Sequence, residues 1–238
     1  MRPIRKKIRK MADDESYFSN RTLKRDNLIL LLSITALILL HPLIKNDLFR
    51  RWIFDLLVSG IVLSAVTSLK FGKEKFIRLS YFAVFTFALV WVHHFAYNEL
   101  TKLISFTVLI LYLIYITYSM VRYIARNQYV DKIILLNAIN SYLLIGVVGA
   151  FLFISVDVGY AYFASGQHAL NFNTISNSSF QDYIYFSFVT LTTLGYGDIT
   201  PIIPISKSLT VALSLTGQLY LTILVAMLVG KYLSQDDN

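Results

Sequence analysis

The sequence contains no cysteine and few charged residues, and each shortage excludes a class of protein. Without cysteine the chain can form neither a disulfide framework nor a thiolate metal site. Charged residues make up 15% of the 238 residues, against roughly 25% in soluble domains. Hydrophobic residues make up 56%. This balance is typical of a protein embedded in a membrane.

The basic residues behind the net charge of +8 gather near the N-terminus. Nine of them precede the first apolar run, where lysine and arginine hold a terminus in the cytoplasm, so we expect no nucleic-acid partner. Two alternatives stay open for the first 10 residues: an amphipathic helix on anionic membrane lipid, or a disordered positive tail. The nine basic residues are Arg2, Arg5, Lys6, Lys7, Arg9, Lys10, Arg21, Lys24 and Arg25.

Six apolar runs are long enough to cross a bilayer, which takes about 17 to 25 helical residues. With them, 17 of the 22 lysines and arginines face inward and 5 face outward, as the positive-inside rule requires. The pattern therefore predicts a multi-pass, all-α protein of the cell membrane with both termini in the cytoplasm. The six predicted transmembrane helices cover residues 28–44, 52–69, 79–95, 103–121, 133–156 and 205–233.

The fourth of these runs carries no charge. In voltage sensors the corresponding helix carries arginines at every third position, and each charge moved through the field is worth about 2.3 kcal/mol per 100 mV. Here no charged residue lies between Leu103 and Val121, while Arg122 and Arg126 follow the run. We therefore do not expect classical voltage gating.

A shorter apolar segment, Phe180 to Leu191, follows a polar stretch at residues 157–178 that we expect to form an outer loop. A helix of these 12 residues rises only about 18 Å, against a hydrocarbon core of about 30 Å. Ser179 and Asp182 have the capping-box spacing that begins a helix. A half-length helix entering from outside directs its negative C-terminal end at the membrane centre, which favours a cation there. We therefore predict a re-entrant helix.

The next segment reads Thr-Thr-Leu-Gly-Tyr-Gly-Asp over residues 192–198. Gly195 and Gly197 can adopt positive φ without steric cost, so the backbone from Thr193 to Gly197 can alternate its handedness and aim successive carbonyl oxygens to one side. Rings of carbonyl oxygens can replace the water shell of a monovalent cation. In a soluble protein a Gly-Tyr-Gly triplet is usually a turn, but here it lies between membrane-length apolar runs.

Residues 192–198 resemble the signature sequence of potassium channels, and the chain resembles a bacterial six-transmembrane, one-pore subunit without a charged voltage-sensor helix. The resemblance implies a homotetramer around a central fourfold axis, with one selectivity-filter strand from each subunit. Gly197 completes the filter and, with Asp198, shapes its outer mouth. The implied K+ ligands are the carbonyls of Thr193, Leu194, Gly195 and Tyr196 and the Thr193 hydroxyl.

The resemblance also assigns residues that support the filter. Tyr185 and Phe186 would pack against the Tyr196 ring and hold the filter's diameter, and Thr192 belongs to the same supporting set. Val189 stands where many bacterial channels have a glutamate, which puts gating through a buried carboxyl pair in doubt.

In the last run Gly217 is either a gating hinge or a point of close helix packing, and both alternatives stay open. The resemblance divides the chain into three parts. These are a basic cytoplasmic N-terminus at residues 1–27, a four-helix membrane domain at 28–130 that resembles a voltage-sensor domain without gating charges, and a pore domain at 131–238.

We therefore expect a potassium-selective channel that conducts K+ passively and needs no cofactor besides the permeant ion. The first alternative is a nonselective monovalent cation channel, and the second is a non-conducting membrane scaffold or a transporter. An enzyme is not expected, because the sequence shows no metal-ligand cluster and no nucleophile with a matching base. His93 and His94 are adjacent rather than at helical spacing, which favours an interfacial pair over a metal site.

Overall fold

The computed structural model describes residues 20–40, 43–44, 46–69, 71–96, 99–127, 129–164, 166–172 and 179–236. Over these residues the chain is mostly helical, as predicted, with two short antiparallel strands, β1 (Leu170–Phe172) and β2 (Ile199–Pro201). The helices are α2 (Asn20–Leu39), α3 (Asp47–Thr67), α4 (Lys73–Ala96), α5 (Glu99–Arg126), α6 (Lys132–Phe163), α7 (Phe180–Leu191) and α8 (Pro204–Asp236).

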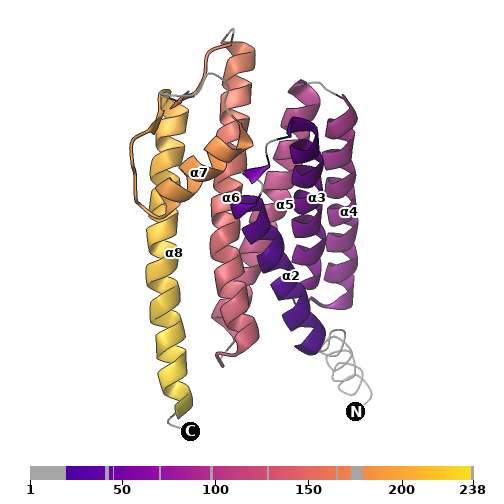
Figure 1. Ribbon diagram of the computed structural model, residues 1–238. Coiled ribbons are helices and arrows are strands. Elements are labelled where there is room, and N and C mark those ends of the chain that lie inside the picture. Colours follow the sequence, from indigo (N-terminus) through magenta and orange to yellow (C-terminus); the bar gives the residue numbers. More distant parts are fainter. Residues whose placement is uncertain are drawn as a thin grey trace.

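Helix α6 holds the two halves of the molecule together (Figure 1). It packs against α2 and α5 on one side and against α7 and α8 on the other. Of its 32 residues, 16 are buried. Helices α2 to α5 form a bundle in which each helix packs against the next. The candidate site lies in the other half, on the short helix α7 and the chain that follows it.

Four of the described helices are long and apolar enough to cross a membrane: α4, α5, α6 and α8. The first two predicted spans form α2 and α3, but both helices begin earlier than predicted and carry charge in their first halves. On length and composition the described helices thus support four of the six predicted spans. These charged residues include Lys24, Arg25 and Asp26 in α2, and Arg50, Arg51 and Asp55 in α3.

Helix α6 also extends beyond its predicted end at Val156, and this corrects the expected outer loop from Asp157 onward. The Asp157 carboxylate is 2% exposed, yet it has partners. It accepts hydrogen bonds from the Ala169 amide and the Tyr183 hydroxyl, both at 2.5 Å, and lies 2.8 Å from Nδ1 of His168. Because the returning chain and α7 satisfy this carboxylate, the helix can carry it in a buried position.

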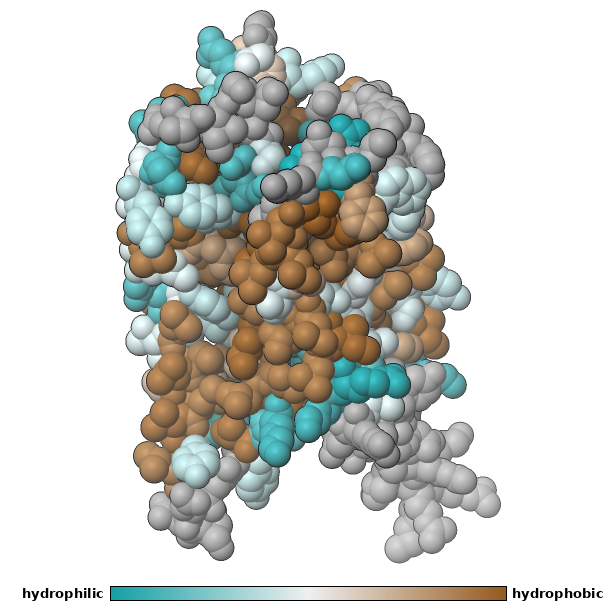
Figure 2. Space-filling model, viewed as in Figure 1, coloured by the Kyte–Doolittle hydropathy of each residue, from teal (hydrophilic) through white to brown (hydrophobic). Residues whose placement is uncertain are grey.

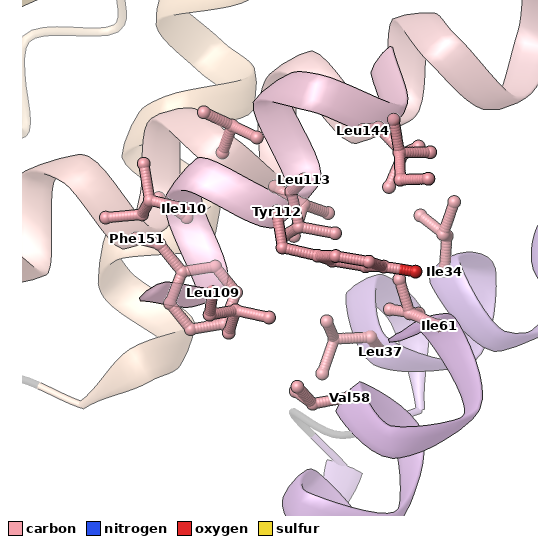
Figure 3. Packing of buried hydrophobic residues seen from close by; sticks show 14 of the residues in the cluster. Ile34, Leu37, Val58, Ile61, Leu109, Ile110, Tyr112, Leu113, Leu144 and Phe151 are labelled. Carbon is pink, nitrogen blue, oxygen red and sulfur yellow. The ribbon is translucent and has the colours of Figure 1, made fainter. Parts of the chain in front are cut away.

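The core of the α2–α5 bundle is apolar, with one hydroxyl at its centre. Tyr112 of α5 is fully buried, and its hydroxyl donates to the carbonyl of Val62 in α3 at 2.6 Å. Figure 3 shows the Tyr112 hydroxyl directed toward Ile34 of α2 and Ile61 of α3. One side chain thus spans three helices and fixes how deeply α5 sits against its neighbours.

A second polar contact joins the bundle to α6. Asn140 of α6 donates through Nδ2 to the backbone carbonyl of Asn27 at 3.0 Å and to its side-chain oxygen at 3.2 Å. Asn27 in turn donates to the carbonyl of Ser68, after α3, at 2.7 Å. All three residues are fully buried. Buried amides are costly without partners, so these bonds favour one register of α6 against the bundle.

The outer surface is apolar across its middle. Figure 2 shows hydrophobic residues there, with hydrophilic residues above and below. Many large apolar side chains are exposed on the long helices, among them Val84 and Phe85 of α4, Leu111 and Ile114 of α5, and Leu215 and Leu219 of α8. Such a surface requires lipid or a partner subunit to cover it.

Tyr112→Phe should lower the free energy of unfolding by about 1 kcal/mol, because it removes the buried hydrogen bond to Val62 and leaves the ring in place. Tyr118→Phe on the same helix is the matched control, since Tyr118 is 58% exposed. Denaturation midpoints of the purified protein in one detergent measure both effects. Equal midpoints for the two variants would contradict a structural role for the Tyr112 hydroxyl.

Candidate functional site

Helix α7 leads the chain into the site. It covers Phe180–Leu191, the range predicted from the sequence. The Asp182 carboxylate accepts hydrogen bonds from the Ser179 amide at 2.7 Å and the Ser179 hydroxyl at 2.9 Å, so the predicted capping interaction is confirmed. Figure 1 shows α7 inclined across the molecule, with its far end beside the middle of α8 and the following chain running back toward the end where α7 begins. This is the inward-and-back course expected of a re-entrant segment.

The backbone of residues 193–197 alternates in handedness. Its φ is 62° at Thr193, 55° at Gly195 and 81° at Gly197, while Leu194 and Tyr196 do not have positive φ. The prediction for the two glycines is confirmed. Within the described ranges Thr193 is the one residue other than glycine with positive φ, a conformation that costs an ordinary residue about 1–2 kcal/mol. Alternating handedness turns successive carbonyls to one side of the chain.

The amides of this segment are bonded to the end of α7. Leu194 and Gly195 both donate to the carbonyl of Val189, at 3.0 and 3.4 Å. No backbone amide in the described part of the chain donates to the carbonyls of residues 193–196. The first part of the segment therefore has its amides engaged behind it, and the carbonyl oxygens of residues 193–196 are unpaired among the described residues. Unpaired carbonyls on one side are what a cation needs in place of water.

Two threonine hydroxyls lie where α7 ends. Thr192 donates to the carbonyl of Phe188 at 2.7 Å, which closes the last turn of α7. The Thr193 hydroxyl accepts a hydrogen bond from Nε2 of Gln218 in α8 at 3.2 Å. The sequence did not predict a role for Gln218, because nothing in its local pattern shows that the inner helix passes beside Thr193. Gln218 and Thr193 together form a polar group at the inner end of the segment.

At the other end of the segment Tyr185 contacts Asp198. The Tyr185 hydroxyl donates to Oδ2 of Asp198 at 2.6 Å, and the Ile199 amide donates to Oδ1 at 3.1 Å. The bond from Tyr185 lowers the pKa of the Asp198 carboxyl below its ordinary value. Both residues were predicted to support the filter, but Tyr185 was expected to pack on the Tyr196 ring. Its hydroxyl instead ties α7 directly to the outer mouth.

Phe186 faces away from the segment. Its ring lies 4.7 Å from the ring of Phe153 in α6, centroid to centroid, and the residue is only 5% exposed. Tyr196 is 69% exposed. The expected packing of Phe186 on Tyr196 is therefore not formed within this chain, because α6 occupies the Phe186 side of α7. Phe186 supports the segment indirectly, by holding α7 against α6.

Three glycines allow α7 to sit close to its neighbours. A Cβ at Gly146 would clash with the Phe188 ring, and one at Gly149 with the Ser187 hydroxyl. A Cβ at Gly217 of α8 would clash with the Leu191 carbonyl oxygen at the end of α7. The two α6 glycines thus lie where α7 approaches α6 closely. At Gly217 the structure shows close packing, while a hinge there stays a prediction.

The side of the segment away from α7 is open. Leu194 is 60% exposed, and the adjoining face of α8 exposes Leu215, Leu219 and Ile223 by more than half. Beyond Asp198 the chain continues into β2, which pairs with β1 and so returns to the outer end of α6. One chain thus presents a row of carbonyls beside an uncovered apolar face.

Comparison with known proteins shows which proteins this part of the chain is similar to. Residues 141–234 match the family model described as "Ion channel". The matched residues run from within α6 to the last turns of α8 and include the segment of alternating handedness. The similarity is with ion channels and not with enzymes.

The chain also resembles a potassium channel. Over 67 residues it is 40% identical to the two-pore potassium channel 4 of Arabidopsis thaliana. The match covers 28% of this chain and 24% of the plant protein, so the similarity is confined to a short part of each. No solved structure matches the chain significantly.

Gly217→Ala should destabilise the pore domain by about 1–3 kcal/mol, because the added methyl group meets the backbone of Leu191. Gly230→Ala on the same helix is the matched control. Nothing lies within 4 Å of a Cβ at Gly230, so alanine there should leave stability unchanged or raise it slightly. Thermal unfolding midpoints in detergent compare the two, and an equal effect would contradict close packing at Gly217.

Tyr185→Phe should raise the pH at which acid on the outside begins to change ion flux. The bond from Tyr185 lowers the Asp198 pKa, so the carboxylate stays charged further into the acid range. Without the hydroxyl the pKa rises toward its ordinary value, and protonation begins at a higher pH. Flux into proteoliposomes as a function of outside pH measures the shift. Tyr162→Phe, an exposed tyrosine at the outer end of α6, should leave the profile unchanged, and an unshifted profile in Tyr185→Phe would refute the role of the bond.

Proposed function

We propose that the protein is a potassium channel that conducts K+ passively through a filter at residues 193–197. The observation that carries this proposal is the positive φ at Thr193, Gly195 and Gly197, which aligns unpaired carbonyl oxygens on one side of the chain. Carbonyl oxygens are neutral ligands that can replace the hydration shell of a monovalent cation. The Thr193 hydroxyl and Gln218 lie at the inner end of the row, and Asp198 lies at its outer end.

A single chain cannot enclose the ion, so the proposal includes a homotetramer. The row of carbonyls borders open space, and the exposed apolar face of α8 adjoins it. Four copies around a central axis would supply four rows of oxygens and cover these faces with one another. Tyr196 would then lie against a neighbouring subunit, which accounts for its exposure in one chain.

The membrane arrangement is part of the same proposal. Helices α2 and α3 have 20 and 21 residues, which at about 1.5 Å per residue is enough to cross the hydrocarbon core. With them the subunit has six spans, and the beginnings of α2 and α4 and the end of α8 share the cytoplasmic side (Figure 1). In this arrangement residues 28–130 are a four-helix domain and residues 131–238 are the pore domain. The predicted N-terminal segment 1–27 lies mostly outside the described residues, as does the side chain of His93 and of His94.

The inner ends of α5 and α8 are tied together, which bears on gating. Lys231 of α8 donates through Nζ to the carbonyls of Ile124 at 2.8 Å and Ala125 at 3.1 Å, near the end of α5. A cation at a helix C-terminus is favourable. We propose that opening at the inner end of α8 involves movement relative to α5, with Gly217 as the candidate hinge. Because no charged residue lies between Leu103 and Val121 of α5, opening should depend only weakly on voltage.

The proposal is tested by the reversal potential of the purified protein in planar bilayers, with K+ on one side and Na+ on the other. At equal concentrations of the two ions we expect a reversal potential far from zero, with the sign that opposes K+ flow. Equal permeability would favour a nonselective cation channel. Absence of current from intact tetramers would favour the non-conducting scaffold or transporter. Protein-free bilayers provide the control for leak.

A further inference from the structure

A groove with a volume of about 390 Å³ lies between the first half of α4 and the middle of α5. It belongs to the bundle half of the molecule, whereas residues 193–197 follow α7 on the other side of α6. Its lining consists of Lys75, Arg78, Leu79 and Phe82 from α4 and Leu111 and Tyr115 from α5. Two cations, two aliphatic residues and two aromatic residues thus share one groove.

The polar and apolar residues lie at different depths. Lys75 and Arg78 are in the first two turns of α4, and Phe82 lies about 10 Å further along the helix from Lys75. Leu111 and Tyr115 belong to the middle of α5, well inside its apolar stretch. The groove is therefore cationic where α4 begins and apolar toward the middle of the membrane belt.

The two cations have no partner among the described residues. Neither Lys75 nor Arg78 has a salt bridge or hydrogen bond there, although Glu74 lies four residues before Arg78 on the same helix. An arginine guanidinium can bind a phosphate through two parallel hydrogen bonds, and a lysine adds a point charge beside it. The lining thus has charge complementary to a phosphate and lacks a protein anion to neutralise it.

The apolar end of the groove faces the lipid. Leu111 is 57% exposed and Tyr115 is 42% exposed, while Leu79 forms the floor at 6%. A ligand in this groove would meet charge at the membrane surface and hydrocarbon contacts below it. A soluble phosphate would use only the first of these, whereas a phospholipid would use both.

We propose that this groove binds one anionic phospholipid from the leaflet next to the beginning of α4. Its phosphate lies between Lys75 and Arg78, and an acyl chain runs over Phe82 and Leu111. The proposal rests on the membrane arrangement put forward above, and it is independent of ion selectivity. Basic grooves between membrane helices on the cytoplasmic side are suited to anionic headgroups.

Native mass spectrometry of the full-length protein tests the proposal, with phosphatidylglycerol and phosphatidylcholine added at matched concentrations. The double variant Lys75→Gln/Arg78→Gln should lose about 30-fold in phosphatidylglycerol affinity, since each surface cation contributes about a factor of five. Arg122→Gln/Arg126→Gln removes the same charge from the end of α5 without touching the groove, and it should retain the affinity. Phosphatidylcholine should bind weakly to all three proteins.

Three outcomes would overturn the proposal. The first is an equal loss in both double variants, which would indicate general attraction to basic residues. The second is an unchanged affinity in Lys75→Gln/Arg78→Gln. The third is displacement of the lipid by soluble glycerol phosphate at equal concentration, which would indicate a free-phosphate site. Binding is measured without current, so a failed potassium test leaves this result interpretable.

Discussion

The backbone conformation of residues 193–197 is the constraint on which the rest of the pore domain depends. Positive φ at every second residue brings carbonyl oxygens to one side, but it also places Thr193 in a conformation that an ordinary residue avoids. Such a segment persists only where its surroundings hold it. The carbonyl of Val189 binds the Leu194 amide behind it, Gln218 contacts Thr193 at one end, and Tyr185 holds Asp198 at the other. The surrounding helices therefore determine what the segment can bind.

These supports require α7 to lie unusually close to α6 and α8. The absence of side chains at Gly146, Gly149 and Gly217 allows this approach, and the Ser187 hydroxyl adds a hydrogen bond to the Gly146 carbonyl at 2.7 Å. In a membrane, helices gain little free energy from excluding lipid, so close packing and hydrogen bonds contribute more to helix association. The same logic applies to Asn140 and Asn27, which join α6 to the bundle. Helix α6 thus fixes the position of α7, which holds residues 193–197, relative to the bundle.

Local patterns predicted the pore region well. The limits of α7, the capping role of Asp182 and the positive φ of Gly195 and Gly197 follow from short-range chemistry: helix length, side-chain reach and the lack of a Cβ.

The long-range contacts could not be predicted from the sequence. The buried position of Asp157 depends on Ala169 and Tyr183, whose return to α6 has no local signature. The orientation of Phe186 toward Phe153, and the contact of Gln218 with Thr193, likewise depend on how distant helices meet. The first two predicted spans covered only the apolar runs. Both helices begin earlier, in charged turns that a hydropathy criterion leaves out.

The central claim is that the proposed filter needs glycine at position 197 because of the backbone handedness there, and not because a side chain would clash. A Cβ at Gly197 would meet nothing within 4 Å in the chain, so within one chain it is the φ of 81° that disfavours an ordinary residue there. D-Alanine favours positive φ and L-alanine does not. The most direct measurement is therefore K+ flux through proteoliposomes carrying semisynthetic protein with either residue at position 197. The account predicts flux with D-alanine and little or none with Gly197→Ala, and equal flux through the two proteins would contradict it.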